Sequence, residues 1–342
     1  MLNTEKTPAA DSPPFSPWRL CVAPMLDWTD KHCRHLHRLI TRHARLYTEM
    51  VTCGALLHGS QRRHLRMDEI EHPVALQLGG SEPAELAACA RMGQQWGYDE
   101  INLNCGCPSP RVQRGAFGAS LMNEPARVAD CVRAMRDAVS VPVTVKHRIG
   151  IDREESYAFV RDFVGALALA GCEVFIVHAR NAWLQGLSPK ENREVPPLRY
   201  EWVYQLKRDF PALTICLNGG VADNDQAAAH LAHVDGVMLG RAAYYHPWLL
   251  AEWDARFFGA HTPAPEREAA ERAMLAYMRQ EQRDDGTPWY PIARHMLGLR
   301  HGLRGARAWR QVWSNHKLKP LPPDAVWQMA QAHVAAPESG QE

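Results

Sequence analysis

The segment Asn104-Cys105-Gly106-Cys107-Pro108 contains the strongest candidate for acid catalysis in this sequence. A thiol has an ordinary pKa of about 8.5, so at neutral pH it is mostly protonated and can deliver a proton to a nearby carbon atom. Because Gly106 and Pro108 flank Cys107, we favour Cys107 as the presented thiol and Cys105 as a packing residue. The competing interpretation is that either cysteine is an inert buried thiol.

Two cysteines separated by one residue could instead hold a metal ion. Structural zinc sites usually combine two closely spaced pairs of cysteine or histidine ligands. No second pair with that spacing follows Cys107 in the chain. We therefore expect no bound metal.

Two short glycine-containing segments have the residues of phosphate-binding loops. They read Asn218-Gly219-Gly220 and Gly240-Arg241. Glycine allows backbone N–H groups to approach a phosphate closely, and a helix that begins after such a loop adds a favourable dipole. The alternative is that the paired glycines only make a tight turn. No G-x-G-x-x-G fingerprint occurs in the chain, so a separate dinucleotide-binding domain is unsupported.

Three further polar residues could contact the body of a phosphate-bearing ligand. Lys146 follows an apolar run, and a cation there could stabilise a reduced isoalloxazine ring near N1 and O2. The amide of Gln77 could pair with the pyrimidine edge of the same ring. His178 is weaker support, because a histidine after a strand is more often a hydrogen-bonded core or rim residue than a ligand contact.

The elements that must position these residues alternate between strand and helix. Eight short apolar runs rich in β-formers are bounded by turn residues and separated by helix-length segments. The runs cover residues 20–25, 46–51, 73–78, 100–104, 141–146, 173–178, 213–217 and 234–239. Eight buried parallel strands within about 240 residues predict a (β/α)8 TIM barrel. A doubly wound open sheet is the competing architecture.

The polar candidates favour the closed barrel because they follow the ends of different strands. They are Met25, Gln77, Asn104, Lys146, His178, Asn218 and Arg241. In a closed barrel the carboxyl ends of all strands converge on one mouth, where barrel enzymes have their active sites. In an open sheet the same residues would be spread along an edge.

The remainder of the chain predicts a small all-helical C-terminal domain, with helix candidates at 266–283 and 291–300 after a proline-containing linker. We divide the chain into a tail at 1–17, a catalytic barrel at 18–260, a helical domain at 261–335 and a second tail at 336–342. The segment 286–323 contains seven basic and no acidic residues, which leaves 32 basic and 38 acidic residues elsewhere. Such a segment is typical of a protein that binds a phosphate-bearing partner, although it could be only a solvated helix face.

Composition excludes several classes of protein. The 342 residues are 46% hydrophobic and 23% charged, as in ordinary globular proteins. No apolar stretch is long enough for a membrane span, and the N-terminal residues lack the apolar core of a secretory signal. Nine scattered cysteines do not indicate a disulfide framework, so we expect a reducing, cytoplasmic setting. We also expect a monomer.

Taken in order, these motifs resemble those of the tRNA-dihydrouridine synthases. They are Ala23-Pro24-Met25, Gln77-Leu78-Gly79-Gly80, Asn104-x-Gly106-Cys107-Pro108, Lys146-x-Arg148, His178-Ala179-Arg180, Asn218-Gly219-Gly220 and Gly240-Arg241. The segments 186–193, 196–198 and 294–298 resemble the A subfamily in particular. The resemblance covers residues 20–317 and is specific as an ordered set, although each motif alone is weak.

The resemblance implies a flavoenzyme that binds FMN, takes electrons from NADPH and reduces D-loop uridines of tRNA, at positions 20 and 20a for this subfamily. By match of motif, the FMN-binding residues would be Pro24, Met25, Leu26, Gln77, Lys146, His178, Asn218, Gly219, Gly220, Gly240 and Arg241. Hydride would pass from N5 of FMN to C6 of uracil, and Cys107 would protonate C5. The expected RNA contacts are Asn104, Lys190, Arg193, Arg294, Arg304 and Arg307.

Two other functions remain open at this point. A flavin-dependent barrel reductase of a small molecule, such as dihydroorotate or an enone, would explain the mouth but would leave the basic segment unused. A tRNA-binding chaperone on an inactive barrel would explain the basic segment, but not why Cys107 and Lys146 lie at strand ends.

Overall fold

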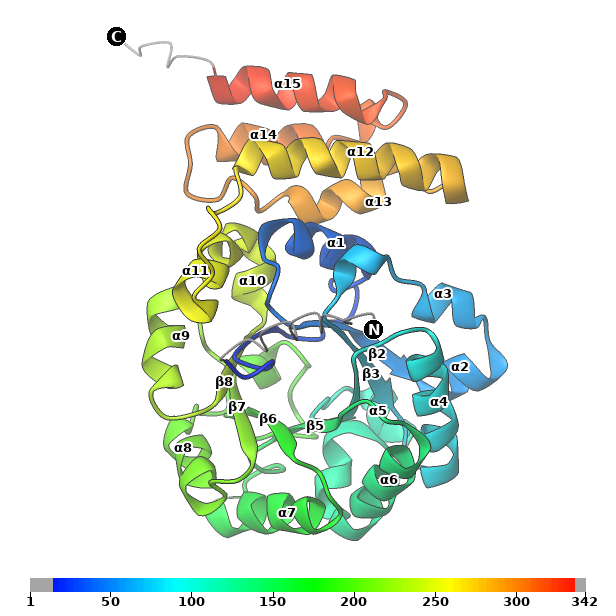
Figure 1. Ribbon diagram of the computed structural model, residues 1–342, viewed down its shortest axis with the longest axis vertical. Helices are drawn as coiled ribbons and strands as arrows, with labels where there is room; N and C mark the ends of the chain where they lie inside the picture. Colours follow the sequence, from blue (N-terminus) through cyan, green and yellow to red (C-terminus); the bar gives the residue numbers. More distant parts are fainter. Residues whose placement is uncertain (1–14, 155, 336–342) are drawn as a thin grey trace, which may run out of the picture.

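The computed structural model describes residues 15–154 and 156–335, which form a barrel and a layer of helices beside it (Figure 1). The barrel strands are β1 (Leu20–Val22), β2 (Leu46–Thr52), β3 (Val74–Gly79), β4 (Glu100–Cys105), β5 (Val143–Arg148), β6 (Val174–His178), β7 (Thr214–Asn218) and β8 (Gly236–Leu239). Their order in the sheet is β1-β8-β7-β6-β5-β4-β3-β2, and the neighbours pair in parallel.

The sheet closes between β1 and β2. Cys21 forms a parallel bridge with Arg45, and the Val22 N–H donates to the Arg45 carbonyl at 2.9 Å. The predicted (β/α)8 barrel is therefore confirmed, and the open-sheet alternative is wrong. Each predicted strand is present, with some ends unchanged and the others shifted by one to three residues.

Helices surround the barrel and connect its strands (Figure 1). The α-helices of this part are α1 (Lys31–Ile40), α2 (Cys53–His58), α3 (Gln61–Leu65), α4 (Pro83–Gln95), α5 (Pro110–Arg114), α6 (Pro125–Ala138), α7 (Tyr157–Leu169), α8 (Tyr200–Asp209), α9 (Asn224–Leu231), α10 (Arg241–Tyr245) and α11 (Trp253–Phe258). The short 3-10 helices are η1 (Glu69–Glu71), η2 (Gly118–Asn123), η3 (Glu191–Arg193) and η4 (Pro247–Glu252).

The inside of the barrel combines a small apolar core with polar side chains. The apolar part is made of Cys21, Ala23, Tyr47, Ala75, Val174, Ile176, Cys216 and Met238. Because successive side chains of a strand point to opposite faces, Thr144, Lys146 and Arg148 of β5 share one face. Lys146 is thus two residues before the end of its strand, since β5 continues to Arg148.

The C-terminal residues form the predicted helical region, which packs beside α1 (Figure 1). Its helices are α12 (Arg267–Asp285), α13 (Trp289–Ala293), η5 (Arg294–Met296), α14 (Ala306–Trp313), η6 (His316–Leu318) and α15 (Pro323–Ala335). Lys31 of α1 forms an ion pair with Glu281 at 2.7 Å, and Nδ1 of His32 bonds to the Tyr277 hydroxyl at 2.8 Å. Within residues 15–154 and 156–335, no helix has the length and apolar character needed to span a membrane.

Arg300 and Arg294 of the basic segment each bond to an acidic side chain of the protein. Arg300 forms two hydrogen bonds with Glu271, at 2.8 and 2.9 Å, and is buried. Arg294 donates to Asp30 at 2.7 Å and so connects the helical region to α1. The other five cations are exposed, namely Arg304, Arg307, Arg310, Lys317 and Lys319. Arg300 is therefore withdrawn from any surface that a phosphate-bearing partner could contact, whereas the Arg294 side chain stays partly exposed.

Candidate active site

One cavity of about 1440 Å³ opens at the carboxyl ends of the strands. It brings together fourteen of the predicted site residues. These are Pro24, Met25, Leu26, Gln77, Asn104, Cys107, Lys146, His178, Arg193, Asn218, Gly219, Gly220, Gly240 and Arg241. Lys190 is exposed beside Pro189, which lines the cavity, whereas Arg294, Arg304 and Arg307 belong to the helical region.

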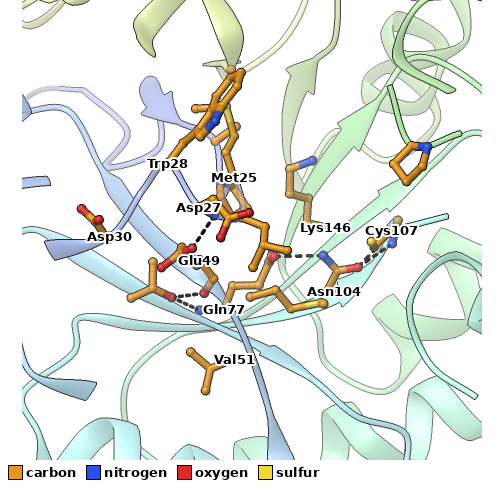
Figure 2. A pocket seen from close by; sticks show the side chains of 18 of the residues that line it. Met25, Asp27, Trp28, Asp30, Glu49, Val51, Gln77, Asn104, Cys107 and Lys146 are labelled. Atoms are coloured by element: carbon orange, nitrogen blue, oxygen red, sulfur yellow. Dashed lines mark hydrogen bonds between the residues drawn. The ribbon is translucent and has the colours of Figure 1, made fainter. Parts of the chain in front are cut away.

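The loop after β4 holds Cys107 at the wall of this cavity (Figure 2). Asn104 Oδ1 accepts the backbone N–H groups of Gly106 at 3.1 Å and Cys107 at 3.0 Å. Nε of Arg148 donates to the Gly106 carbonyl at 3.1 Å, and the Cys107 carbonyl accepts the Ala119 N–H at 3.0 Å. The loop is therefore fixed at several points around the thiol.

The environment of Cys107 keeps its thiol protonated. Burial raises the pKa of Cys107, and the nearby Arg148, Lys146 and Arg193 offset only part of this rise. All nine cysteines lie within the described residues, and the other eight are buried. Cys105 is fully buried in the core, as expected for a packing residue.

The amides of Gln77 and Asn104 meet beside Cys107. Asn104 Nδ2 donates to Gln77 Oε1 at 2.9 Å, and the two side chains join the ends of β3 and β4 (Figure 2). Asn104 is buried to 8% exposure and Gln77 to 1%, yet both line the cavity. Each amide retains N–H groups that a ligand carbonyl could accept.

Positive charge gathers along the wall formed by β5 to β8. Burial, with a smaller effect of Arg148, lowers the pKa of Lys146 to about 7. Burial also lowers the pKa of His178 well below its ordinary value, helped by the surrounding cations, so the ring is neutral. Arg193 and Arg241 line the same wall, and Arg241 forms an ion pair with Glu194 at 2.6 Å. This wall suits an anionic ligand.

The two glycine loops differ in why they contain glycine. Gly219 and Gly220 have φ values of 105° and 77°, which L side chains rarely adopt. A Cβ on Gly219 would also meet the His178 ring at 3.1 Å. A Cβ on Gly240 would meet protein atoms no closer than 3.7 Å, although this residue lines the cavity. A glycine there is therefore not required by packing within the protein, and its bare backbone fits the close approach of a ligand.

Carboxylates line the opposite wall, which sequence patterns did not indicate. Asp27 has a φ of 63°, and its backbone N–H donates to Glu49 Oε1 at 2.5 Å (Figure 2). Burial raises the pKa of Glu49 above its ordinary value. Asp30 lines the same side of the cavity. This side has mixed charge, because basic residues also line it, namely Lys31, Arg34, Arg62, Arg63 and Arg66.

Two more residues were missed by the sequence reasoning. Arg148 appeared only as part of a motif, yet it holds the Cys107 loop and donates to the carbonyls of Asn181 and Asn192. The signal in the sequence was its position two residues after Lys146, which places both side chains on the same face of β5. Trp28 lines the cavity and stacks on Tyr244 with ring centroids 4.5 Å apart, and only its position after the first strand could have indicated this.

No group of three or more potential metal ligands among histidine, cysteine, aspartate and glutamate occurs in the part of the chain that the structure describes. The available groups are instead a thiol, amides, a lysine and arginines around one cavity. An eight-stranded barrel with such groups at the carboxyl ends of its strands defines the class of barrel enzymes.

Comparisons with known proteins give the family. Residues 21–331 match the family described as dihydrouridine synthase (Dus). The chain is 56% identical to the tRNA-dihydrouridine(20/20a) synthase of Pseudomonas putida over 329 residues, or 96% of this chain and 97% of that one. It is 57% identical to the enzyme of the same name from Escherichia coli over 302 residues, or 88% and 87% of the two chains. The chain belongs to the dihydrouridine synthase family.

Proposed function

We propose that this protein is an FMN-dependent enzyme that reduces the C5–C6 bond of uridines 20 and 20a in the D-loop of tRNA, with NADPH as electron donor. The observation that carries the proposal is the cavity itself, where a protonated thiol, two amides and a cationic wall surround one space. The names of the close relatives, tRNA-dihydrouridine(20/20a) synthase, support the substrate.

The residues present fit FMN. Nδ1 of His178 is buried without a hydrogen-bond partner among the described residues, and it lies on the cationic wall. Gly219, Gly220 and Gly240 line the cavity, where their backbone N–H groups could meet a phosphate, and Arg241 lies next to Gly240. Lys146 and Gln77 face the same cavity from β5 and β3. Pro24, Met25, Leu26 and Asn218 complete the proposed set.

FMN bound in this cavity would supply the hydride that C6 of the uracil receives from N5 of the flavin. Cys107 then acts as the general acid: its S–H bond breaks, a C–H bond forms at C5, and solvent returns a proton to the thiolate. Asn104, Lys146 and Arg193 donate hydrogen bonds to the uracil carbonyls, where negative charge develops during the reduction.

The target nucleotide must leave the folded tRNA to reach this cavity, because a stacked base cannot enter it. Lys190 and Arg193 lie near the mouth, and Arg304 and Arg307 lie on the exposed surface of the helical region. Arg294 is placed between the two regions by its ion pair with Asp30. We assign Lys190, Arg294, Arg304 and Arg307 to phosphate contacts, which hold the tRNA by shape rather than by sequence, whereas Arg193 faces the uracil in the cavity.

The proposal also covers the setting of the enzyme. We propose a cytoplasmic monomer, with a catalytic barrel at 18–260 and a tRNA-binding helical domain at 261–335. The tails at 1–17 and 336–342 lie mostly or wholly outside the described residues.

The proposal is tested by mass spectrometry of tRNA from a strain that lacks the gene for this chain. We expect uridines 20 and 20a to lack the two hydrogen atoms of dihydrouridine, and other D-loop positions to be unchanged. Unaltered modification at both positions would overturn the proposed substrate. An absorbance scan of the purified protein for flavin bands tests the cofactor separately.

A further inference from the structure

A continuous chain of hydrogen bonds runs through the barrel from the Cys107 loop towards the amino-terminal end of β4. The Cys107 N–H donates to Asn104 Oδ1 at 3.0 Å, and Asn104 Nδ2 donates to Gln77 Oε1 at 2.9 Å. Gln77 Nε2 then donates to Asn102 Oδ1 at 2.7 Å. Each of these bonds donates in the same direction, away from the cavity mouth.

The series of hydrogen bonds continues to the buried carboxylate of Glu100. Asn102 Nδ2 donates to Thr144 Oγ1 at 2.7 Å, and the Thr144 hydroxyl donates to Glu100 Oε1 at 2.5 Å. Asn102, Thr144 and Glu100 are all completely buried. Strand register causes this arrangement, because Gln77 pairs with Asn102 and Asn102 pairs with Thr144 across neighbouring strands.

Both ends of the chain fix its direction independently. At the Cys107 end of the series, a backbone N–H can only donate, so the Asn104 side chain must turn its oxygen towards Cys107. At the opposite end, Glu100 is surrounded by donors. Besides Thr144, the Tyr47 hydroxyl donates at 2.8 Å and the Trp18 indole at 2.7 Å. Arg45 lies 3.2 Å from the same carboxylate. If any side-chain amide between these ends were flipped, it would place a donor against a donor or an acceptor against an acceptor.

The direction of these hydrogen bonds determines which amide atoms of Gln77 and Asn104 remain available to a ligand. Their oxygens are used inside the chain, so the groups left for the cavity are N–H donors. We propose that Glu100 is a positioning residue, which acts through Thr144 and Asn102 to keep these two amides in their donor orientation and the Cys107 loop in place. This inference rests on the proposed function, in which donors stabilise charge that develops on carbonyl oxygens.

Thr144 and Tyr47 offer a matched pair of variants, because each donates one hydrogen bond to Glu100 Oε1. Thr144→Val keeps the shape of the side chain but cuts the chain between Asn102 and Glu100. Tyr47→Phe removes a bond to the same carboxylate and leaves the chain intact. Thr144→Ser restores the hydroxyl, and Asn102→Leu cuts the chain one link nearer the mouth as a second variant.

Two readouts are measured on the purified full-length proteins. The first is the single-turnover rate of uridine reduction by enzyme already reduced with NADPH. The second is the rate at which iodoacetamide alkylates Cys107, which is the only cysteine that is not buried in the described residues. Thermal unfolding of each variant reports the loss of stability for comparison.

We expect Thr144→Val and Asn102→Leu to slow uridine reduction about tenfold or more and to change the rate of Cys107 alkylation, since amides without fixed partners lose their orientation. Tyr47→Phe should match the wild type in both readouts, even where its thermal stability falls equally, and Thr144→Ser should restore both. Equal effects of Thr144→Val and Tyr47→Phe would overturn the inference and leave the proposed function standing. A wild-type protein that reduces no uridine would instead overturn the proposed function. In that case the rate of Cys107 alkylation would still test whether the hydrogen-bond series positions the Cys107 loop.

Discussion

The Lys146 ammonium group donates a hydrogen bond to Asn218 Oδ1 at 2.9 Å, which connects β5 to β7 across the intervening strand β6. Asn218 is held in turn by its own bond to the Met238 carbonyl at 2.8 Å. Lys146 therefore has a fixed position at the cavity wall, and among residues 15–154 and 156–335 it has no carboxylate partner. A buried cation of this kind is stabilised when an anionic ligand binds.

This position of Lys146 predicts that FMN binding depends on pH. Burial lowers the Lys146 pKa to about 7, so the side chain is charged below that pH and loses its proton above it. An anion binds more tightly to the charged form, and the affinity of the apoprotein for FMN should fall by up to about tenfold per pH unit above pH 7. Quenching of FMN fluorescence between about pH 6.5 and 8.5 measures this.

Lys146→Met is the control for that experiment, because it removes the titrating group and keeps most of the side-chain volume. We expect its dissociation constant for FMN to be raised and nearly independent of pH. A pH dependence as steep as that of the wild type would show that another group titrates.

A second prediction concerns the thiol. Cys107→Ala should slow uridine reduction by at least about 100-fold, because a positioned general acid typically contributes about 10² to 10⁴ in rate. NADPH should still reduce the bound flavin at the wild-type rate, since the thiol has no part in that step. Stopped-flow absorbance separates the two steps. Cys105→Ala is the matched control, and comparable losses in both variants would point to a structural effect.

The ion pair between Arg241 and Glu194 predicts opposite effects of two substitutions. Arg241→Ala should weaken FMN binding about tenfold or more, because it removes charge-assisted bonds to the phosphate. Glu194→Ala should tighten FMN binding by no more than about fivefold, since an exposed, solvent-screened ion pair no longer competes for the guanidinium. Equilibrium titration of apoprotein measures both. If Glu194→Ala also weakens binding, the pair orients Arg241 rather than competing with the ligand.

The cations assigned to phosphate contacts predict a strong salt dependence of tRNA binding. With these four, Lys190, Arg294, Arg304 and Arg307, on phosphates, log affinity should fall with log salt with a slope of about −3 to −4. Arg307→Ala should reduce the steepness by about one, whereas Arg133→Ala on α6 should leave it unchanged. Filter binding at several salt concentrations gives the slopes. A slope near zero would exclude this surface as the docking site.

Much of the fold and of the cavity wall could be predicted from the sequence, because both depend on local signals. Apolar runs of strand length predicted all eight strands. The rule that barrel strands converge at their carboxyl ends then placed Gln77, Asn104, Lys146 and Asn218 around one mouth, and the structure confirms that they line one cavity.

What the sequence could not predict depends on register and on partners far away in the chain. The link from Asn102 through Thr144 to Glu100 exists only because β4 and β5 pair in one particular register. Arg300 was counted in a basic surface, but it lies in the turn before α14, and its partner Glu271 lies 29 residues earlier on α12. Neither the Asn102–Thr144–Glu100 link nor the Arg300–Glu271 ion pair produces a periodic pattern in the sequence.

The most direct test of the central claim uses purified protein, NADPH and an unmodified tRNA transcript that contains the D-loop uridines. After digestion, mass spectrometry of the D-loop fragment measures the hydrogen atoms gained at each position. We predict a gain of two hydrogen atoms at uridines 20 and 20a, which requires both NADPH and bound FMN. A D-loop fragment of unchanged mass, from protein that has bound FMN and tRNA, would contradict the account.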